Sequence, residues 1–142
     1  MIATKTKVLA YIYRQTNLVH ELLVFDHEGI PEAGTQIVGG TVESGEELKA
    51  ALAREIEEEA GLKVSRDQME MLSKTTYKRS DKPEINERTY FKIELNNLPD
   101  RWSHRVKSDG EDNGLIFNFY WLSFDAAKVI LTGNFAECLQ LI

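Results

Sequence analysis

The chain has 142 residues, which suits a single domain over residues 1–142, and a chain of this length can bury about two-thirds of the surface that its unfolded form exposes. Its net charge of -6 argues against a polymeric nucleic acid as partner, because proteins that bind one tightly usually carry a basic surface. Cys138 is the only cysteine and Val8 to Tyr13 is the longest apolar stretch near the start, so we expect no disulfide framework, no membrane segment and a cytoplasmic setting.

The first third of the chain predicts a hairpin followed by a loop. Lys7 to Arg14 and Val19 to Phe25 are rich in β-branched and aromatic residues, and Gln15 to Asn17 separates them as a turn would. Asp26 to Thr35 contains two glycines and a proline, which indicates a loop. Gln36 to Val38 then predicts a short extended segment.

A helix is predicted next. Ser44 and Glu47 have the spacing of a capping box, and Gly61 supplies the left-handed residue at which a helix commonly ends. We therefore expect a helix from about Ser44 to Ala60.

The second half predicts further strands at Met69 to Tyr77, Arg88 to Leu95 and Phe117 to Leu122. Asn96 to Gly114 is polar and too long for a simple turn, so we expect a functional loop there. Two short helices are expected at the end of the chain, at Phe124 to Leu131 and Phe135 to Leu141, with Ser123 and Asn134 as their caps and Gly133 between them.

The predicted helix carries two kinds of glutamate. With about 100° per residue, Glu58 falls near -60° and Glu59 near +40° relative to Glu55, so three carboxylates share one face. Glu57 points the opposite way, and the apolar stripe beside the acidic face contains Leu52, Ala53, Ile56 and Ala60. Converging carboxylates repel one another, and their hard oxygen atoms suit Mg²⁺ or Mn²⁺. A solvated acidic face is the alternative interpretation.

The residues around this helix carry a family resemblance. Gly40 to Leu62 has the sequence GTVESGEELKAALAREIEEEAGL. It resembles the Nudix box, G-x5-E-x7-R-E-U-x-E-E-x-G-U with U a bulky aliphatic residue, at every defined position. The matching residues are Gly40, Glu46, Arg54, Glu55, Ile56, Glu58, Glu59, Gly61 and Leu62. Ile37 and Val38 stand where the family often has Leu-Pro.

The resemblance implies an α/β (α+β) fold, the Nudix-type α/β/α sandwich with a mixed β-sheet. It implies a Mg²⁺-dependent pyrophosphohydrolase, which cleaves the diphosphate bond of a nucleoside diphosphate linked to another moiety (NDP-X) by water attack at phosphorus. Carried over by position, Glu55, Glu58, Glu59 and the main-chain carbonyl of Gly39 would hold Mg²⁺ or Mn²⁺. Arg54 would orient the glutamates, and Glu46 would brace the loop on the helix.

Base and substrate groups are less constrained by the sequence. A box glutamate or one from a later loop could accept the water proton, and Glu111 is the best loop residue for that role. Tyr77 and Trp102 could stack on the nucleobase of a substrate, and Arg79 and Arg88 could contact its phosphates. Core packing and ordinary surface charge are the alternatives.

The charge pattern and the box bear on the competing functions. Glu43 to Glu59 holds seven Glu against two basic residues, whereas Lys74 to Lys107 holds nine basic residues against five acids, as suits a site where cations meet a phosphate. A non-catalytic nucleotide-binding Nudix regulator and an isomerase on the same fold are the alternatives, but an intact set of box glutamates favours the enzyme. A homodimer is compatible with the resemblance, and the expected partner is a small nucleotide diphosphate.

Overall fold

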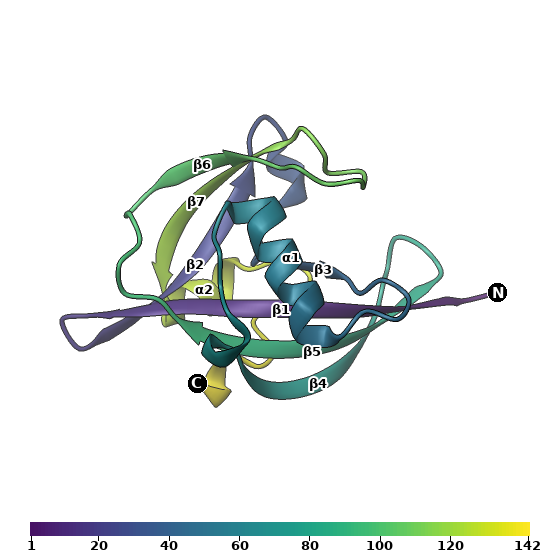
Figure 1. The fold of residues 1–142 in the computed structure, drawn as a ribbon, viewed down its shortest axis with the longest axis horizontal. Helices are drawn as coiled ribbons and strands as arrows, with labels where there is room; N and C mark the ends of the chain where they lie inside the picture. Colours follow the sequence, from purple (N-terminus) through teal and green to yellow (C-terminus); the bar gives the residue numbers. More distant parts are fainter.

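The protein is built on one long central strand, β1, in a seven-stranded mixed sheet (Figure 1). The computed structural model describes residues 1–142. The strands are β1 (Ala3–Thr16), β2 (Val19–His27), β3 (Gly39–Thr41), β4 (Glu70–Lys78), β5 (Glu84–Glu94), β6 (Trp102–Arg105) and β7 (Ile116–Ser123), and the α-helices are α1 (Leu48–Ala60) and α2 (Phe124–Ile130). Short 3-10 helices lie at Pro31–Ala33, Arg66–Gln68 and Leu139–Leu141. No helix is both long and apolar enough to cross a membrane.

The strand order is β4-β5-β1-β2-β7-β6, with β3 paired to β1. β5 runs parallel to β1 from Ala3 to Tyr13, and every other pairing is antiparallel. On its other side β1 pairs with β3 at Lys7 to Leu9 and with β2 only from Tyr13 to Thr16. β2 therefore separates from β1 beyond Tyr13, and β3 pairs with the first half of β1 instead.

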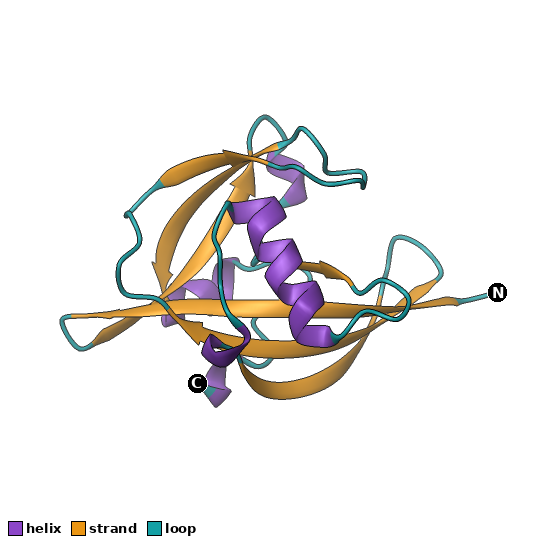
Figure 2. Cartoon of the chain, viewed as in Figure 1, coloured by secondary structure: helices purple, strands orange, loops and turns teal.

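Alternation along β1 gives the sheet two apolar faces. Val8, Ala10 and Ile12 belong to the core under α1, whereas Leu9 and Tyr11 belong to a second core under the carboxyl-terminal segment. Successive residues of a strand point to opposite faces, so one strand supplies both cores. The two cores give the α/β/α layering that the family resemblance implies (Figure 2).

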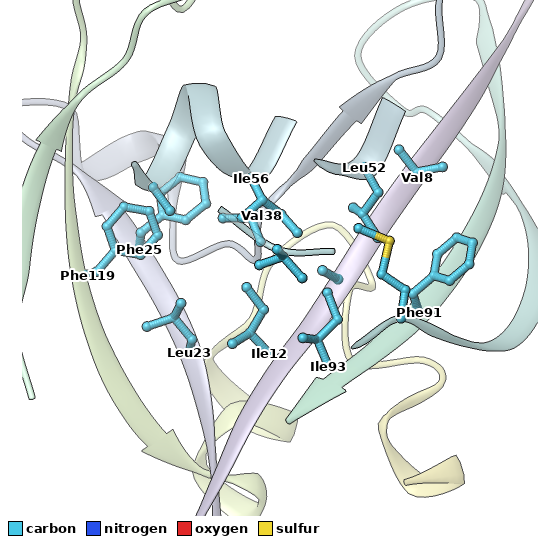
Figure 3. Close-up of a cluster of buried hydrophobic side chains, with 14 of the residues drawn as sticks. Val8, Ile12, Leu23, Phe25, Val38, Leu52, Ile56, Phe91, Ile93 and Phe119 are labelled. Carbon is cyan, nitrogen blue, oxygen red and sulfur yellow. The ribbon is translucent and has the colours of Figure 1, made fainter. Parts of the chain in front are cut away.

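The apolar stripe of α1 is buried largely as its sequence predicts. Leu52 and Ile56 are fully buried, Ala60 is 3% exposed, and Ala53 is only partly buried against the same core. Figure 3 shows Leu52 and Ile56 packed toward Val8 and Val38. Full burial of a Leu or Ile side chain contributes roughly 1.5–3 kcal/mol, so this stripe fixes how α1 lies on the sheet.

The start of α1 differs from the prediction. The helix begins at Leu48, and its N-cap residue Glu47 makes no side-chain capping bond. Glu46 instead accepts a hydrogen bond from the Glu43 backbone N–H at 3.0 Å, and Gly45 adopts a φ of 78°. The expected capping box at Ser44 is therefore wrong, because the loop is closed by Glu46 before the helix begins. The predicted stop at Gly61 is confirmed by its φ of 73°.

The first turn and the predicted loop in the second half of the chain also differ from the prediction. The first turn consists of Asn17 and Leu18, both at positive φ, since Thr16 already pairs with Val19. The predicted loop from Asn96 to Gly114 contains β6, whose four residues pair with β7. Only two of those four side chains are even partly buried, so their alternation is too short to predict a strand.

The end of the chain forms one helix rather than two. α2 begins after Ser123, whose side chain accepts a hydrogen bond from the Ala126 N–H as expected of a cap. The predicted helix at Phe135 to Leu141 is wrong, because only Leu139–Leu141 is helical. Tyr11 donates its hydroxyl to the Phe135 carbonyl at 2.5 Å, so tertiary bonding takes a group that a helix would use.

Candidate active site

The acidic face of α1 lines a cavity of about 550 Å³ at one end of the molecule. β3 and the residues after it form one side, and the loop from Val106 to Asp112, between β6 and β7, forms another. Basic residues at the start of β1 and in the turn between β4 and β5 complete the lining. Figure 1 shows these loops on the same side of the molecule as β3.

Arg54 is the centre of the polar network in this cavity. Its Nε and Nη2 atoms both donate to the Glu46 carboxylate at 2.9 Å, and Nη2 also donates to the Thr41 carbonyl at 3.1 Å. The Arg54 hydrogen bonds lower the pKa of Glu46 to about 2, so this carboxylate is ionised. The paired bonds tie the loop before α1 to the helix itself.

The third guanidinium nitrogen of Arg54 lies between two helix glutamates. Nη1 donates to Glu55 at 3.0 Å and to Glu58 at 3.4 Å. The side chains of Glu55 and Glu58 are 13% and 22% exposed, so they do not form a solvated acidic face. Glu57 on the same helix is exposed, as the wheel predicts.

Glu59 is the most buried glutamate of the helix, with only 7% of its surface exposed. Its Oε1 accepts a single hydrogen bond from the Gly39 backbone N–H at 2.9 Å. Burial raises the pKa of Glu59 well above its usual value, and the nearby charge of Glu55 raises it further. Gly39 is expected to contribute its carbonyl to a metal, and its N–H also contacts one of the expected metal ligands, Glu59.

The Glu55 carboxylate lies so close to Gly40 of β3 that residue 40 has no room for a side chain. A Cβ at Gly40 would come within 2.3 Å of the Glu55 carboxyl carbon, so the bare peptide at this position makes room for the carboxylate. Burial raises the pKa of Glu55 to about 7, although Arg54 opposes the shift. This close approach explains why the box begins with glycine.

These residues fit a divalent cation by their chemistry. The carboxylates of Glu55 and Glu59, whose pKa values burial raises, and that of Glu58 beside them repel one another, and Arg54 is the one cation hydrogen-bonded to them. Oxygen-rich, negatively charged sites suit Mg²⁺ and Mn²⁺. The carboxylates do not close on one point in this arrangement, since Arg54 holds Glu55 and Glu58 while Glu59 turns to Gly39.

The loop between β6 and β7 brings further acids to the cavity. Glu111 and Asp112 both line it and are exposed, and the Lys107 N–H donates to the Glu58 carbonyl at 3.2 Å, which joins the loop to α1. The charge of Asp112 contributes to the raised pKa of Glu59. Asp112 is therefore a second loop acid at the site, next to the residue that the sequence singles out.

The four predicted substrate contacts separate into two groups. Arg79 lines the cavity, whereas Tyr77, Arg88 and Trp102 do not. Arg88 is 3% exposed, with its guanidinium 3.9 Å from the centre of the Tyr77 ring. Trp102 stacks on Phe119, with the ring centroids 4.9 Å apart. The packing interpretation therefore fits these three residues, which lie outside this cavity, and their contact with substrate stays a prediction.

Sequence reasoning missed three basic residues of the cavity, Lys5, Lys7 and Lys82. Lys5 and Lys7 alternate at the start of β1, which is the only signal the sequence offers for their shared face. Lys82 lies in a turn whose position depends on the β4–β5 pairing. Their common location is a result of the sheet topology.

A family model described as NUDIX domain matches residues 4–138. The fold is similar to a MutT NUDIX hydrolase from Burkholderia pseudomallei, at 20% identity over 98% of both chains and a TM-score of 0.72. It is also similar to the NUDIX domain of Shewanella oneidensis NrtR complexed with ADP ribose, at 14% identity, 100% of this chain, 86% of that chain and a TM-score of 0.68.

A MutT/nudix family protein from Enterococcus faecalis matches 87% of this chain with 17% identity and a TM-score of 0.64, but this chain spans only 45% of that protein's length. No curated protein sequence matches the chain. At these identities the solved structures show the shared fold alone. The family match over residues 4–138, with a box complete at every defined position, shows that the chain belongs to the NUDIX domain family.

Proposed function

We propose that this NUDIX domain is a Nudix hydrolase, a Mg²⁺- or Mn²⁺-dependent pyrophosphohydrolase that cleaves the diphosphate bond of an NDP-X substrate by water attack at phosphorus. The observation that carries the proposal is the half-buried carboxylate of Glu55 and the buried carboxylate of Glu59, beside Glu58 in a cavity that also presents cations. Nudix hydrolases generally use divalent metal ions, and this donor set suits one.

Each residue of the box has a role in the proposal. Glu55, Glu58 and Glu59 hold the metal, together with the main-chain carbonyl of Gly39. When bound, the metal supplies charge neutralisation at the diphosphate and a more acidic bound water. Arg54 positions the carboxylates through its bonds to two of them.

The proton of the attacking water goes to a carboxylate of the site. Glu111 is the proposed base, because it lines the cavity from an exposed loop and stands outside the Arg54 network. General bases of this kind contribute about 10²–10⁴-fold to a rate.

The proposal treats residues 1–142 as one NUDIX domain, since both cores share β1. A small nucleotide diphosphate is the proposed partner, in a cytoplasmic setting that suits the lone, buried Cys138. A homodimer is compatible with the proposal, and it requires neither a membrane nor a polymeric nucleic acid.

The test is hydrolysis with and without Mg²⁺ over ADP-ribose, dinucleoside polyphosphates, NADH, oxidised nucleoside triphosphates and sugar nucleotides. Glu58→Gln and Glu59→Gln should each abolish Mg²⁺-dependent turnover and leave the fold intact, and Glu111→Gln should lower kcat by about 10²-fold or more. Glu57→Gln is the matched control, because this residue is on the same helix but exposed, away from the cavity. Equal turnover by Glu59→Gln and wild type would refute the metal role.

A second candidate function is nucleotide binding without turnover. The NUDIX domain of Shewanella oneidensis NrtR, whose fold is similar, is complexed with ADP ribose. Measurable affinity for nucleotides in calorimetry, with no hydrolysis of any compound in the panel, would favour this regulator function over the enzyme.

A further inference from the structure

A basic wall faces the acidic helix across the cavity. We use this name for Lys5 and Lys7 of β1 with Arg79 and Lys82 of the β4–β5 turn, all of which line the cavity. Figure 1 shows this turn beside the amino-terminal end of β1. Two segments far apart in sequence meet here because β1 and β5 run parallel, with Ala3 opposite Glu84.

The basic wall is anchored by one buried carboxylate. Glu84 is 4% exposed and forms ion pairs with Lys5 at 3.3 Å, Arg79 at 3.4 Å and Lys82 at 3.9 Å. Asn86 donates to the same carboxylate at 2.8 Å, and this bond above all lowers the pKa of Glu84 to about 2. Glu84 is thus a fixed anion that holds three cations in one place.

The basic wall keeps an excess of positive charge. Arg79 also binds Asp81 through two hydrogen bonds, at 2.8 Å and 2.5 Å, so two carboxylates face four cations. The side chains of Lys5 and Lys82 remain 45% and 48% exposed, which leaves ammonium protons free for a ligand. An anion in the cavity would meet cations whose positions are already set.

Lys7 connects the basic wall to the glutamates. Its Nζ donates to the Thr41 hydroxyl at 2.6 Å, on β3 next to the residue that touches Glu55. Lys7 lines the cavity together with Arg79 of the basic wall and Glu55 of the helix. An anionic chain could therefore extend from the helix glutamates past Lys7 to Lys82.

Resting on the proposed function, we propose that the basic wall is a second phosphate subsite, which binds a phosphate group beyond the diphosphate bond being cleaved. The X group of the substrate is then itself a phosphate, and substrates with three or more phosphates are hydrolysed in preference to nucleoside diphosphate sugars. The glutamates define where the bond breaks, and the basic wall selects what lies beyond it.

The test compares a nucleoside triphosphate with an NDP-sugar, whose X group is an uncharged sugar. Lys82→Ala should lower kcat/KM for ATP or GTP about 10-fold more than for UDP-glucose or ADP-ribose, and Lys82→Arg should retain most of the wild-type preference. Lys128→Ala is the matched control, because this lysine is 52% exposed, against 48% for Lys82, and pairs only with Asp125 on α2. An equal loss on both substrate classes, or no loss, would overturn the subsite.

A binding measurement separates this inference from the proposed function. In calorimetry with inorganic tripolyphosphate and Mg²⁺, Lys82→Ala should bind about 10-fold more weakly than wild type and Lys128→Ala equally well. If the wild type hydrolyses nothing but this difference is seen, the proposed function fails and the subsite stands. If the wild type is an active hydrolase and tripolyphosphate binding is the same in all three proteins, the subsite fails alone.

Discussion

The glycine that opens the box is in contact with a glutamate. A Cβ at Gly40 would lie within 2.5 Å of all three carboxyl atoms of Glu55, closer than real contacts allow. The φ of Gly40 is not positive, so its backbone tolerates a side chain and the carboxylate must move instead. We expect Gly40→Ala to fold normally but to lose at least about 10-fold in kcat/KM, with a higher Mg²⁺ requirement. Metal titration of the hydrolysis rate would measure this.

Gly110 provides the control for that substitution. It also lines the cavity, but the nearest atom to a Cβ there is the Ser108 hydroxyl at an ordinary 3.8 Å. Gly110→Ala should therefore keep the wild-type metal dependence. If both variants behaved alike, contact with Glu55 would not be the reason for glycine at position 40.

Part of the site could be predicted at the level of single residues. The helical spacing alone placed Glu55, Glu58 and Glu59 on one face, and Glu57 away from it. It could not predict that Glu59 is buried, because this depends on β3 and on the loop after β6. The basic wall was also out of reach, since Glu84 collects its cations from separate strands and a turn.

At the level of elements, β6 stabilises the end of α1. Trp102 donates its indole N–H to the carbonyl of Ala60, the last residue of the helix, at 3.1 Å. Carbonyls in the last turn of a helix have no partner within the helix, so this bond satisfies one of them. Trp102, which the sequence suggests as a nucleobase-stacking residue, therefore helps to hold the end of α1.

We expect Trp102→Phe to lower the free energy of unfolding by about 1 kcal/mol, the usual net contribution of one hydrogen bond. The Phe ring can keep the stacking on Phe119, and the space left by the smaller ring adds to the loss of the bond. Urea unfolding would measure it, and the KM for the nucleotide should stay within about twofold of wild type. A large rise in KM with unchanged stability would instead restore Trp102 as a base-stacking residue.

Elements were predictable where local and tertiary preferences agree. The stop of α1 at Gly61 and the cap of α2 at Ser123 depend only on nearby residues. The capping box at Ser44 failed where the Glu47 carboxylate pairs with Arg66, and the helix from Phe135 failed where Tyr11 donates to the Phe135 carbonyl. Local patterns therefore predict an element reliably only until a long-range hydrogen bond competes for its ends.

At the level of the whole molecule, the fold class could be predicted but the sheet order could not. The Nudix box implies the α/β/α sandwich, which the structure has. The parallel pairing of β1 with β5 joins Ala3 to Glu84, and no local pattern contains a contact over that separation. The cavity depends on this pairing, because it brings the basic wall opposite the glutamates.

Glu55 and Glu59 also affect the stability of the whole domain. Burial raises the pKa of Glu55 to about 7 from 4.5, and that of Glu59 well above 4.5. Between pH 4.5 and these raised pKa values, the two glutamates are ionised in the unfolded chain but still protonated in the folded domain. The free energy of unfolding therefore falls as the pH rises through this range. Glu46 and Glu84, with pKa values lowered to about 2, act in the opposite sense but only at pH values below about 5.

We therefore expect the Tm measured in a chelator to decrease by several degrees from pH 5.5 to pH 8, and Mg²⁺ at pH 8 to reverse most of that decrease. Glu59→Gln removes one of the two titrating carboxyls and can still accept the Gly39 hydrogen bond, so its Tm in chelator should be higher than that of wild type at pH 8 and similar at pH 5.5. All other titrating groups are common to both proteins, so their difference reports Glu59 together with its effect on the neighbouring Glu55. A Tm difference that did not change with pH would mean that Glu59 is already ionised in the folded domain without metal. The charge of the site would then not need a metal ion to neutralise it, and the physical argument for the metal site would fail.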